Sequence, residues 1–271
     1  MASNSSAAAV RRTLLKQLVI TDFKLRYQGS ILGYFWSLFK PMMTFGVLFV
    51  VFTYIIPTGK DVPHFPAYLL LGIVVWTFFV EATTMGLGSI VGRGDLIKKV
   101  SISKISIVIS STLSAGVNLA LNSVVVLVFM LISGAEVNWL LLPFVPLLIL
   151  ELVLLATGLA LVLSALYVKF RDFAPIWEII LQVMFYATPI IYPLTLAFKA
   201  HPTIAEILSL NPLAQIMQDL REILITPVTL TTHEVLPVAL SYILPIVMVL
   251  AMTALGYLYF KKRSQYFVED L

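Results

Sequence analysis

The sequence predicts an all-α integral membrane protein with six transmembrane helices, an N-terminal interfacial helix and two short re-entrant helices. Hydrophobic residues make up 60% of the 271-residue chain and charged residues only 12%, whereas soluble domains carry about 25% charged residues. The apolar residues form long runs, as membrane spans require. The Lys and Arg residues gather on one side of those runs, as they do in cytoplasmic loops of membrane proteins.

The N-terminal segment is polar and then amphipathic. Residues 1–10 are rich in Ser and Ala, and we expect a disordered tail there rather than a cleavable signal peptide. In residues 11–28, polar side chains and leucines occupy different helical faces: Gln17, Thr21, Lys24 and Gln28 on one, and Leu14, Leu15, Leu18 and Leu25 on the other. This pattern predicts a helix that lies in the membrane interface. A merely solvated leader is the alternative.

Six apolar runs predict the membrane spans, because crossing about 30 Å of hydrocarbon takes roughly 20 residues. The runs lie at about 34–56, 67–90, 106–132, 139–166, 174–191 and 236–260. These spans occupy so much of the chain that residues 11–271 are expected to form one transmembrane domain, with no separate soluble domain.

The distribution of Lys and Arg predicts the orientation of the spans. If the N-terminus is cytoplasmic, only Lys60, Lys199 and Arg221 of the 18 Lys and Arg residues fall on the outer side. Both termini are therefore predicted to be cytoplasmic, and the long 192–235 segment is predicted to face outward.

The stretch at about 199–226 predicts two short re-entrant helices next to the fifth span. Pro189 and Pro193 break the apolar run of that span, since proline cannot continue a helix. One short helix is expected to begin at His201-Pro202, and the other at Asn211-Pro212, with Asn211 as its cap. In the second, Leu213, Ile216, Met217, Leu220 and Leu224 share one face, opposite Asp219 and Glu222. Broken helices at membrane depth must be covered by protein or line a water-filled cavity, so this stretch predicts a gated exit.

Enzymatic chemistry finds little support in the sequence. The absence of cysteine excludes disulfides, thiolate metal sites and a cysteine nucleophile. The histidines His64, His201 and His233 fall in predicted outer loops, without an HExxH pairing or a nucleophile elbow. Because no Walker A motif occurs either, the chain is not expected to bind ATP. Uphill transport would draw on a gradient or on a partner.

Two acidic residues, Glu81 and Glu151, fall in the middle of the second and fourth predicted spans. A carboxylate in hydrocarbon is costly, so such a residue is a functional candidate. One interpretation is a proton relay. The other is an acid that is protonated or hydrogen-bonded to polar partners such as Asn118 or Asn122.

Aromatic side chains are dense in the first span and around the break in the fifth. They are Phe45, Phe49 and Phe52, which share one helical face, and Phe185, Tyr186 and Tyr192, which flank Pro189. Aromatic rings bind sugars and also pack well against lipid or protein. Both a pathway lining and plain helix packing therefore fit this spacing.

The connection at 91–105 is short, basic and punctuated by glycines. Positive-inside bias by itself explains its lysines. A docking helix for a cytoplasmic partner fits the same residues, and their pattern leaves both interpretations open.

Several motifs occur in an order and spacing that a known family shares. The most specific are Asp22–Pro41, which leads into the first span, and Gly94–Lys99 in the basic connection; Phe170–Phe173, Thr188–Pro193, Asn211-Pro212 and Arg221 follow. Together they resemble the transmembrane subunit of polysaccharide ABC exporters, which move lipid-linked O-antigen, capsule and teichoic acid chains across the inner membrane. The resemblance covers nearly the whole chain. One departure is Val100–Ile105, where the family usually has an aromatic residue and a proline.

The resemblance implies a homodimer in the bacterial plasma membrane that works with two ABC ATPase subunits to export a lipid-linked polysaccharide. ATP and Mg would be bound by the partner ATPase, so no cofactor on this chain and no nucleic-acid partner are implied. The first and fifth spans would line a central channel, with the six aromatic residues above as substrate contacts. Coupling to the ATPase would involve Arg26, Asp95, Leu96, Lys98, Lys99, Arg171 and Asp172.

Other functions remain open at the level of sequence. They are an ABC permease for a small lipid or drug, a proton-coupled secondary transporter that uses Glu81 and Glu151, and a non-transporting scaffold. The broken outer helices disfavour the scaffold, because it gains nothing from exposing unsatisfied backbone groups to a cavity.

Overall fold

The described part of the chain is entirely helical. The structure, a computed structural model, describes residues 13, 16–21, 33, 35–56, 62–99 and 103–270, and these contain no strand. Five of the described helices are long and apolar enough to cross a membrane. The predicted all-α membrane fold is therefore confirmed.

The five long helices correspond to five of the six predicted spans. They are α2 (Phe35–Val50) with the π-helical turn η1 (Val51–Ile55), α3 (Phe65–Ser89), α5 (Lys104–Ser133), α6 (Val145–Lys169) after the short η3 (Leu142–Phe144), and α12 (Val238–Arg263). Helix α6 begins later than predicted, and Pro143 and Pro146 lie at its start. Proline suits the first turn of a helix, where its missing N–H leaves no hydrogen bond unmade.

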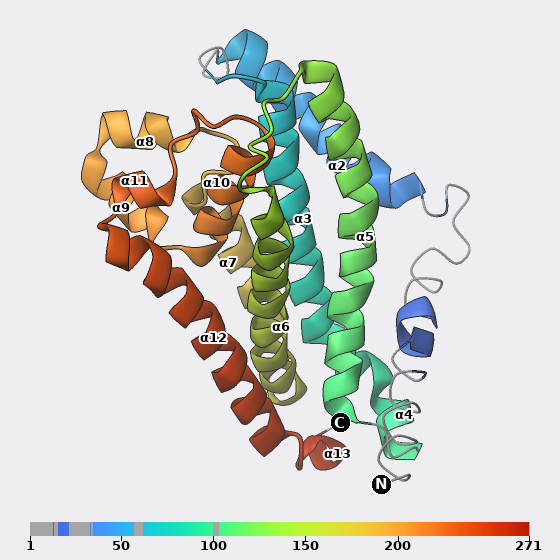
Figure 1. Cartoon of the computed structure of the whole chain (residues 1–271). Coiled ribbons are helices and arrows are strands. Elements are labelled where there is room, and N and C mark those ends of the chain that lie inside the picture. The colour runs from blue at the N-terminus through green and yellow to red at the C-terminus, as the bar shows by residue number, and fades with distance from the viewer. Residues whose placement is uncertain are drawn as a thin grey trace, which may run out of the picture.

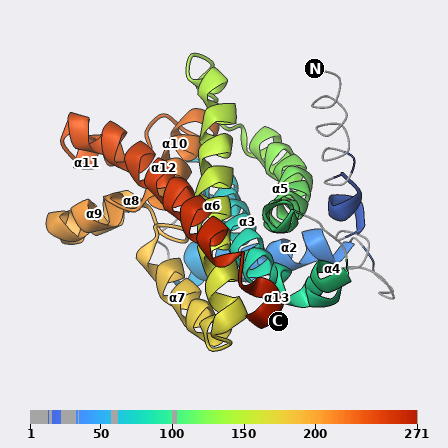
Figure 2. The same cartoon turned by 90° about the horizontal axis from the view of Figure 1, so that it is seen from below.

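Helix α3 lies at the centre of the bundle. It is apolar around its whole circumference and buried along most of its length, as expected of a helix enclosed by others. Helices α5 and α6 pack against it, and α12 packs along the outer side of α6 (Figures 1 and 2). Helix α12 approaches α6 so closely that a Cβ atom at Gly256 would overlap the carbonyl oxygen of Gly158.

The fifth predicted span, at 174–191, is shorter in the structure. Helix α7 covers Phe173–Ala187, 15 residues, or about 22 Å at the usual rise, against about 30 Å of hydrocarbon. It ends because Thr188 precedes Pro189 and adopts an extended conformation, with φ −108° and ψ 137°. The residue before a proline avoids the helical region, so the helix stops before the predicted end of the span.

The stretch after α7 forms four short helices instead of two. They are α8 (Leu194–Ala200), α9 (Pro202–Ser209), α10 (Pro212–Leu224) and α11 (Thr232–Val235), and we call residues 194–235 the cap. The two helices predicted to begin at His201-Pro202 and at Asn211-Pro212 are confirmed as α9 and α10. Helices α8 and α11 were not predicted. Both are short and lack a long apolar periodicity that would reveal them.

The cap lies at one end of the bundle, and two small helices lie at the other (Figure 1). These are α4 (Gly94–Lys99), which follows the single turn η2 (Val91–Arg93), and the C-terminal α13 (Phe267–Asp270). Most of the described basic residues belong to this second end: Arg93, Lys98, Lys99, Lys104, Lys169, Arg171, Lys261, Lys262 and Arg263. Charge is thus segregated between the ends of the bundle in the way that the sequence predicts.

The predicted interfacial helix at 11–28 is described only in part. Residues 16–21 are helical, and the carbonyl of Val19 accepts a hydrogen bond from the Ser114 hydroxyl at 3.5 Å, which sets this turn beside α5. The predicted tail at 1–10 and the coupling residue Arg26 lie outside the described residues.

Candidate functional site

Helix α10 is the buried part of the cap. Asn211 caps its first turn, with the side-chain oxygen accepting a hydrogen bond from the Leu213 amide at 3.0 Å, as predicted. The face opposite the leucines is enclosed as well, because Asp219 is buried and Gln215, Gln218 and Arg221 are buried with it. Helix α10 is enclosed by α3, α6 and α12, so its polar side chains must find partners inside the protein.

Arg221 is the largest fully buried side chain of the described residues. Its guanidinium donates hydrogen bonds to three backbone carbonyls: Nη1 to Pro189 at 2.6 Å, Nη2 to Ile190 at 2.6 Å, and Nε to Tyr68 at 3.2 Å. It also lies on the ring of Tyr68, 3.7 Å from the centroid. A buried charge without partners costs several kcal/mol. Here three carbonyl dipoles and one aromatic face stabilise it.

Two of these carbonyls, those of Pro189 and Ile190, belong to the turn between α7 and α8, which we call the Thr188–Pro193 turn. This turn lies outside any helix, so its carbonyls lack an intrahelical donor and Arg221 supplies one. At the other end of α10, Asn211 Nδ2 donates to Thr188 Oγ1 at 3.1 Å. Both ends of α10 are therefore hydrogen-bonded to the turn that terminates α7.

Gly72 of α3 provides the space for this arrangement. A Cβ atom at that position would overlap Nη2 of Arg221 and would lie 3.0 Å from the carbonyl oxygen of Ile190. Only glycine lets the guanidinium and the turn approach the helix axis this closely. The site thus combines an arginine from α10, a glycine and a tyrosine from α3, and the carbonyls of the Thr188–Pro193 turn.

A second polar contact joins α10 to α11. Nε2 of His233 lies 3.2 Å from Oδ1 of Asp219, and Gln215 Nε2 donates to the same carboxylate. The His233 ring also stacks on Tyr242 of α12, with centroids 3.9 Å apart. Burial alone would lower the pKa of His233, but the hydrogen bond to Asp219 and the negative charges of Asp219, Glu222 and Glu234 outweigh it. The pKa of His233 is consequently raised. Among the described residues, no group of three His, Asp or Glu side chains is placed to hold a metal ion.

The predicted coupling segment forms a separate helix at the opposite end of the bundle. Helix α4 spans the same residues, Gly94–Lys99, and of these only Ile97 is buried. Ile97 belongs to a small apolar cluster with Val168 of α6, Phe260 of α12 and Phe267 of α13. Asp95, Lys98 and Lys99 are exposed, and Leu96 is partly exposed. The helix is anchored by one isoleucine and presents its charges to the outside.

Arg171 and Asp172 lie at the connection between α6 and α7, and both are exposed. The Arg171 guanidinium lies over the ring of Tyr167, 5.2 Å from its centroid. Lys104, at the start of α5, donates to the carbonyl of Ser264 and lies 5.6 Å from the centroid of the Phe267 ring. The C-terminal helix α13 is therefore held against the base of α4 and α5.

The predicted aromatic face of α2 is turned toward the bundle. Phe45 is buried, and its ring packs edge-to-face on Phe129 of α5 with centroids 5.1 Å apart. The Phe45 ring also stacks on Phe49, with centroids 5.7 Å apart. Phe49 and Phe52 are partly buried against the same core. The exposed side of α2 consists of other residues: Met43, Val47, Val50 and Tyr54. Within one chain, helix packing accounts for Phe45, and a role in a channel stays a prediction for all three phenylalanines.

The aromatic residues at the end of α7 point in different directions. Phe185 is partly buried and packs on Trp76 of α3 at 5.7 Å, whereas Tyr186 is 68% exposed. The hydroxyl of Tyr192 donates to the carbonyl of Tyr186 at 2.9 Å and so bridges the Thr188–Pro193 turn. Of the six predicted channel residues, Tyr186 is the one most open to the surroundings of the chain.

The two mid-span acids have different environments. Asn118 Nδ2 donates to Glu81 Oε2 at 2.8 Å, which is the hydrogen-bonded arrangement that the sequence left as one of two alternatives. Glu151 lies in an apolar pocket of about 160 Å³ between α6 and α12, and its Oε1 has no hydrogen-bond partner. The expected contact of Glu151 with Asn118 or Asn122 does not occur, because those asparagines face α2 and α3.

Sequence reasoning missed two features of the site. It placed Arg221 on the outer side but did not anticipate its burial, for which the one available signal was Gly72 within the bulky run 68–76. It also passed over Glu178, which is exposed on α7 together with Gln182, one turn further along. Polar residues four positions apart in an apolar helix mark one polar face, and that spacing could have revealed it.

Comparison with known families shows to which family the chain belongs. The profile of the ABC-2 type transporter family matches residues 13–225, a range that includes both α4 and α10. The chain belongs to the ABC-2 type transporter family. This ABC-2 chain is accordingly a membrane-integral transport protein.

Several curated proteins are similar to this ABC-2 chain over most of their length. The O-antigen export system permease protein RfbA of Myxococcus xanthus is 30% identical over 206 residues, 76% of this chain and 78% of its own. A Klebsiella pneumoniae protein of the same name is 27% identical over 214 residues, covering 78% and 79% of the two chains. The polysialic acid transport protein KpsM of Escherichia coli is 22% identical over 219 residues, covering 80% and 83%.

Proposed function

We propose that this chain is the membrane-spanning subunit of an ATP-driven exporter that moves a lipid-linked surface polysaccharide out of the bacterial cytoplasm. It would act as a homodimer in the plasma membrane, with both termini in the cytoplasm and with ATP hydrolysis on two separate ATPase subunits. The observation that carries the proposal is the similarity to O-antigen export permeases over about three quarters of the chain. The family match includes both the coupling helix and the buried helix of the cap.

The arrangement of the two ends supports an ATP-driven gate. Helix α4 presents Asp95, Lys98 and Lys99 at the basic end, where a cytoplasmic ATPase could dock. The cap lies at the opposite end and is bonded through Arg221 to the turn that terminates α7. Because α7 connects at its other end to Arg171 and Asp172, a displacement at the coupling end could reach the cap through α7.

The exposed face of α7 supports a second copy of the chain. Only Trp177 and Leu181 of this helix are buried, and Glu178 and Gln182 are exposed. A carboxylate that faces lipid is costly. A partner copy that encloses this face in a water-filled pathway would remove that penalty. Tyr186, exposed on the same helix, would then offer one of the weak, repeated contacts that suit the conduction of a polymer.

A complementation experiment tests the proposed function. In a strain that lacks this gene, the chain supplied with its partner ATPase should restore glycan at the cell surface. An ATPase variant that cannot hydrolyse ATP should leave the lipid-linked glycan inside the cell. Normal surface glycan in the deletion strain, or restoration with the inactive ATPase, would contradict the proposal. A normal surface glycan combined with altered export of a small lipid or drug would favour the alternative ABC permease.

The proposed orientation has its own test, because the chain has no cysteine and any introduced one is unique. Glu206 is exposed on α9 in the cap, and Lys98 is exposed on α4. A membrane-impermeant maleimide should label Glu206→Cys in intact spheroplasts and Lys98→Cys only after permeabilisation. The opposite pattern would place the cap in the cytoplasm and overturn the export model.

A proton-coupled transporter is a second candidate, and the unpartnered Oε1 of Glu151 is the observation that favours it. Replacing Glu81 and Glu151 together by glutamine separates the candidates. A proton-coupled mechanism would lose transport, whereas an ATP-driven exporter should retain it with changes in stability alone.

A further inference from the structure

A pocket of about 410 Å³ opens at the cap end of the molecule, beside the Arg221 site. Four parts of the chain form it. They are Ile56 after η1, the start of α3 with Pro63 and Tyr68, the start of α8 with Pro193 to Lys199, and the 228–230 connection between α10 and α11. Its size falls within the roughly 300–1,000 Å³ of small-molecule sites, and a mostly apolar lining with few polar groups is typical of such sites.

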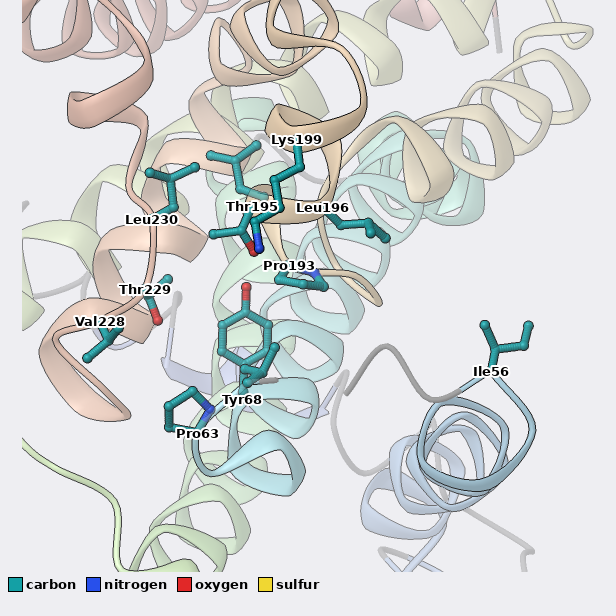
Figure 3. A pocket seen from close by; sticks show the side chains of 12 residues that line it. Ile56, Pro63, Tyr68, Pro193, Thr195, Leu196, Lys199, Val228, Thr229 and Leu230 are labelled. Carbon is teal, nitrogen blue, oxygen red and sulfur yellow. The ribbon is translucent and has the colours of Figure 1, made fainter. Parts of the chain in front are cut away.

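The polar groups of this pocket converge on one region. Figure 3 shows the Tyr68 ring standing in the pocket with its hydroxyl directed toward Thr195 and Lys199, while Thr229 lies across from them. The hydroxyl of Thr229 is buried in the pocket wall and has no hydrogen-bond partner. The side chain of Tyr68 is buried too, and its hydroxyl lies 3.4 Å from Oε1 of Gln218. Hydroxyl groups that both donate and accept therefore lie in the wall of the pocket, where a ligand that carries hydroxyls could engage them.

The remaining lining is apolar and partly rigid. Pro63, Pro193, Leu194 and Val228 supply most of it. A pyranose ring has C–H faces that pack on such surfaces and hydroxyls at its rim that need partners, so this lining fits a sugar better than it fits an acyl chain, which has no use for the hydroxyls.

Lys199 sets the charge of the pocket. It is the one charged side chain among the lining residues. Among the described residues, no carboxylate lies close enough to form an ion pair with it. A single ammonium group beside three hydroxyls fits a carboxylate carried on a polyhydroxylated ring.

We propose that this pocket binds a carboxylate-bearing sugar unit of the exported glycan, with Lys199 contacting the carboxylate and Thr195, Thr229 and Tyr68 contacting sugar hydroxyls. The proposal rests on the proposed export function and assigns a substrate class to one position of the pathway. Tyr68 connects the pocket to the Arg221 site. The Tyr68 ring lines the pocket and also carries the Arg221 guanidinium on its face, so a sugar in the pocket would touch a residue that contacts Arg221.

A protection experiment on the full chain in nanodiscs tests the pocket. Leu196 lines the pocket and is partly exposed, so Leu196→Cys gives a unique thiol at its mouth. The rate of labelling by a charged methanethiosulfonate is measured with glucuronic acid or glucose, which differ only in the carboxylate. We expect glucuronic acid to slow the labelling at about tenfold lower concentration than glucose, because one charge-assisted hydrogen bond has about that effect on affinity.

Matched variants assign this effect to Lys199. The advantage of glucuronic acid over glucose should disappear in Leu196→Cys/Lys199→Gln and persist in Leu196→Cys/Lys199→Arg. A thiol at Glu206→Cys, exposed on α9 and outside the pocket, should be labelled at the same rate with either sugar. Melting temperatures of all variants should match, since Lys199 is exposed.

The proposal is overturned if neither sugar protects Leu196→Cys, if both protect it equally, or if Lys199→Gln leaves the difference unchanged. It is also overturned if nanodiscs containing phosphatidylglycerol protect the thiol without any sugar, since the occupant would then be a lipid headgroup. Wild-type export that continues while the pocket fails these tests leaves the export function intact. A protected pocket in a chain that supports no ATP-driven export contradicts the export function alone.

Discussion

Nη1 of Arg221 lies 2.6 Å from the carbonyl oxygen of Pro189. The arginine belongs to the most buried helix of the cap, and the proline to the turn at which α7 stops. This contact therefore joins the cap to the turn that terminates α7. Because the carbonyls of this turn have no intrahelical donor, the arginine determines where the cap sits.

Replacing Arg221 should loosen the cap more than any other single change in it. Arg221→Met would leave the carbonyls of Pro189 and Ile190 in the turn without donors. We expect a loss of about 3 kcal/mol or more, since each buried unsatisfied group costs about 1–3 kcal/mol. Arg221→Lys should not rescue the protein, because one ammonium group cannot reproduce the three-way fork. The melting temperature in detergent measures the effect. Lys262→Met, at an exposed position of α12, is the control, and an unchanged melting temperature in Arg221→Met would contradict the assignment.

Two glycines of α3 give a matched pair. Gly72→Ala would force a Cβ atom against the Arg221 guanidinium and the Ile190 carbonyl, whereas a Cβ atom at Gly88 would meet nothing within 4 Å. Gly72→Ala should destabilise the protein by about 1–3 kcal/mol through overpacking. Gly88→Ala should be neutral or stabilise it by up to about 1 kcal/mol, because alanine favours the helix. Equal thermal stability of the two variants would exclude the close approach at Gly72.

The contact between His233 and Asp219 predicts a pH dependence of stability. The pKa of His233 is raised in the folded protein, so the protonated form is the stabilising one. Its contribution should be fully present below the ordinary histidine pKa of about 6.5 and should be lost as pH rises through the raised value. The melting temperature of the wild type should therefore exceed that of His233→Gln at low pH, and the two should converge as pH rises. His201→Gln, at an exposed position of α9, should follow the wild type. A wild type that gains stability with rising pH in this window would contradict the sign.

In helix α4, the proposed coupling helix, different residues should contact the ATPase and anchor the helix to the bundle. Lys98 and Lys99 are exposed on α4, while Ile97 is buried beneath it. Lys98→Ala/Lys99→Ala should leave the melting temperature unchanged and lower ATP-driven export by about tenfold, the equivalent of one lost charged contact of about 1.4 kcal/mol. Ile97→Ala should lower both, because removing a buried isoleucine costs about 2–5 kcal/mol. Full export by the double lysine variant would remove these residues from the ATPase interface.

Much of the fold follows from local rules that the sequence obeys. The long apolar runs predict α2, α3, α5, α6 and α12 to within a few residues, because span length is imposed by the bilayer. Proline and asparagine predict the starts of α9 and α10, since capping depends on neighbouring residues alone. Helix α7 ends before its predicted boundary because the conformation of Thr188 is constrained by the next residue.

Such local rules do not predict which neighbours the residues of the candidate site contact. A face of Phe45, Phe49 and Phe52 is visible in the sequence, yet its orientation depends on which neighbour covers it, and in the chain it faces α5. Glu81 accepts a hydrogen bond from Asn118, while Oε1 of Glu151 has no hydrogen-bond partner, although both are single acids in apolar spans. The difference arises from the rotation of α3 and α6 relative to their neighbours, which sequence periodicity does not report.

By itself, the sequence determined that this protein crosses a membrane, that its helices end at particular prolines, and that its basic residues gather at one end, because chain-local sterics and transfer free energies decide these features. Only the tertiary structure decided that Arg221 lies inside the protein, on the Tyr68 ring and against the carbonyls of Pro189 and Ile190. Burying a guanidinium requires several acceptors at once, and only the packing of α3, α10 and the turn after α7 brings them to the arginine.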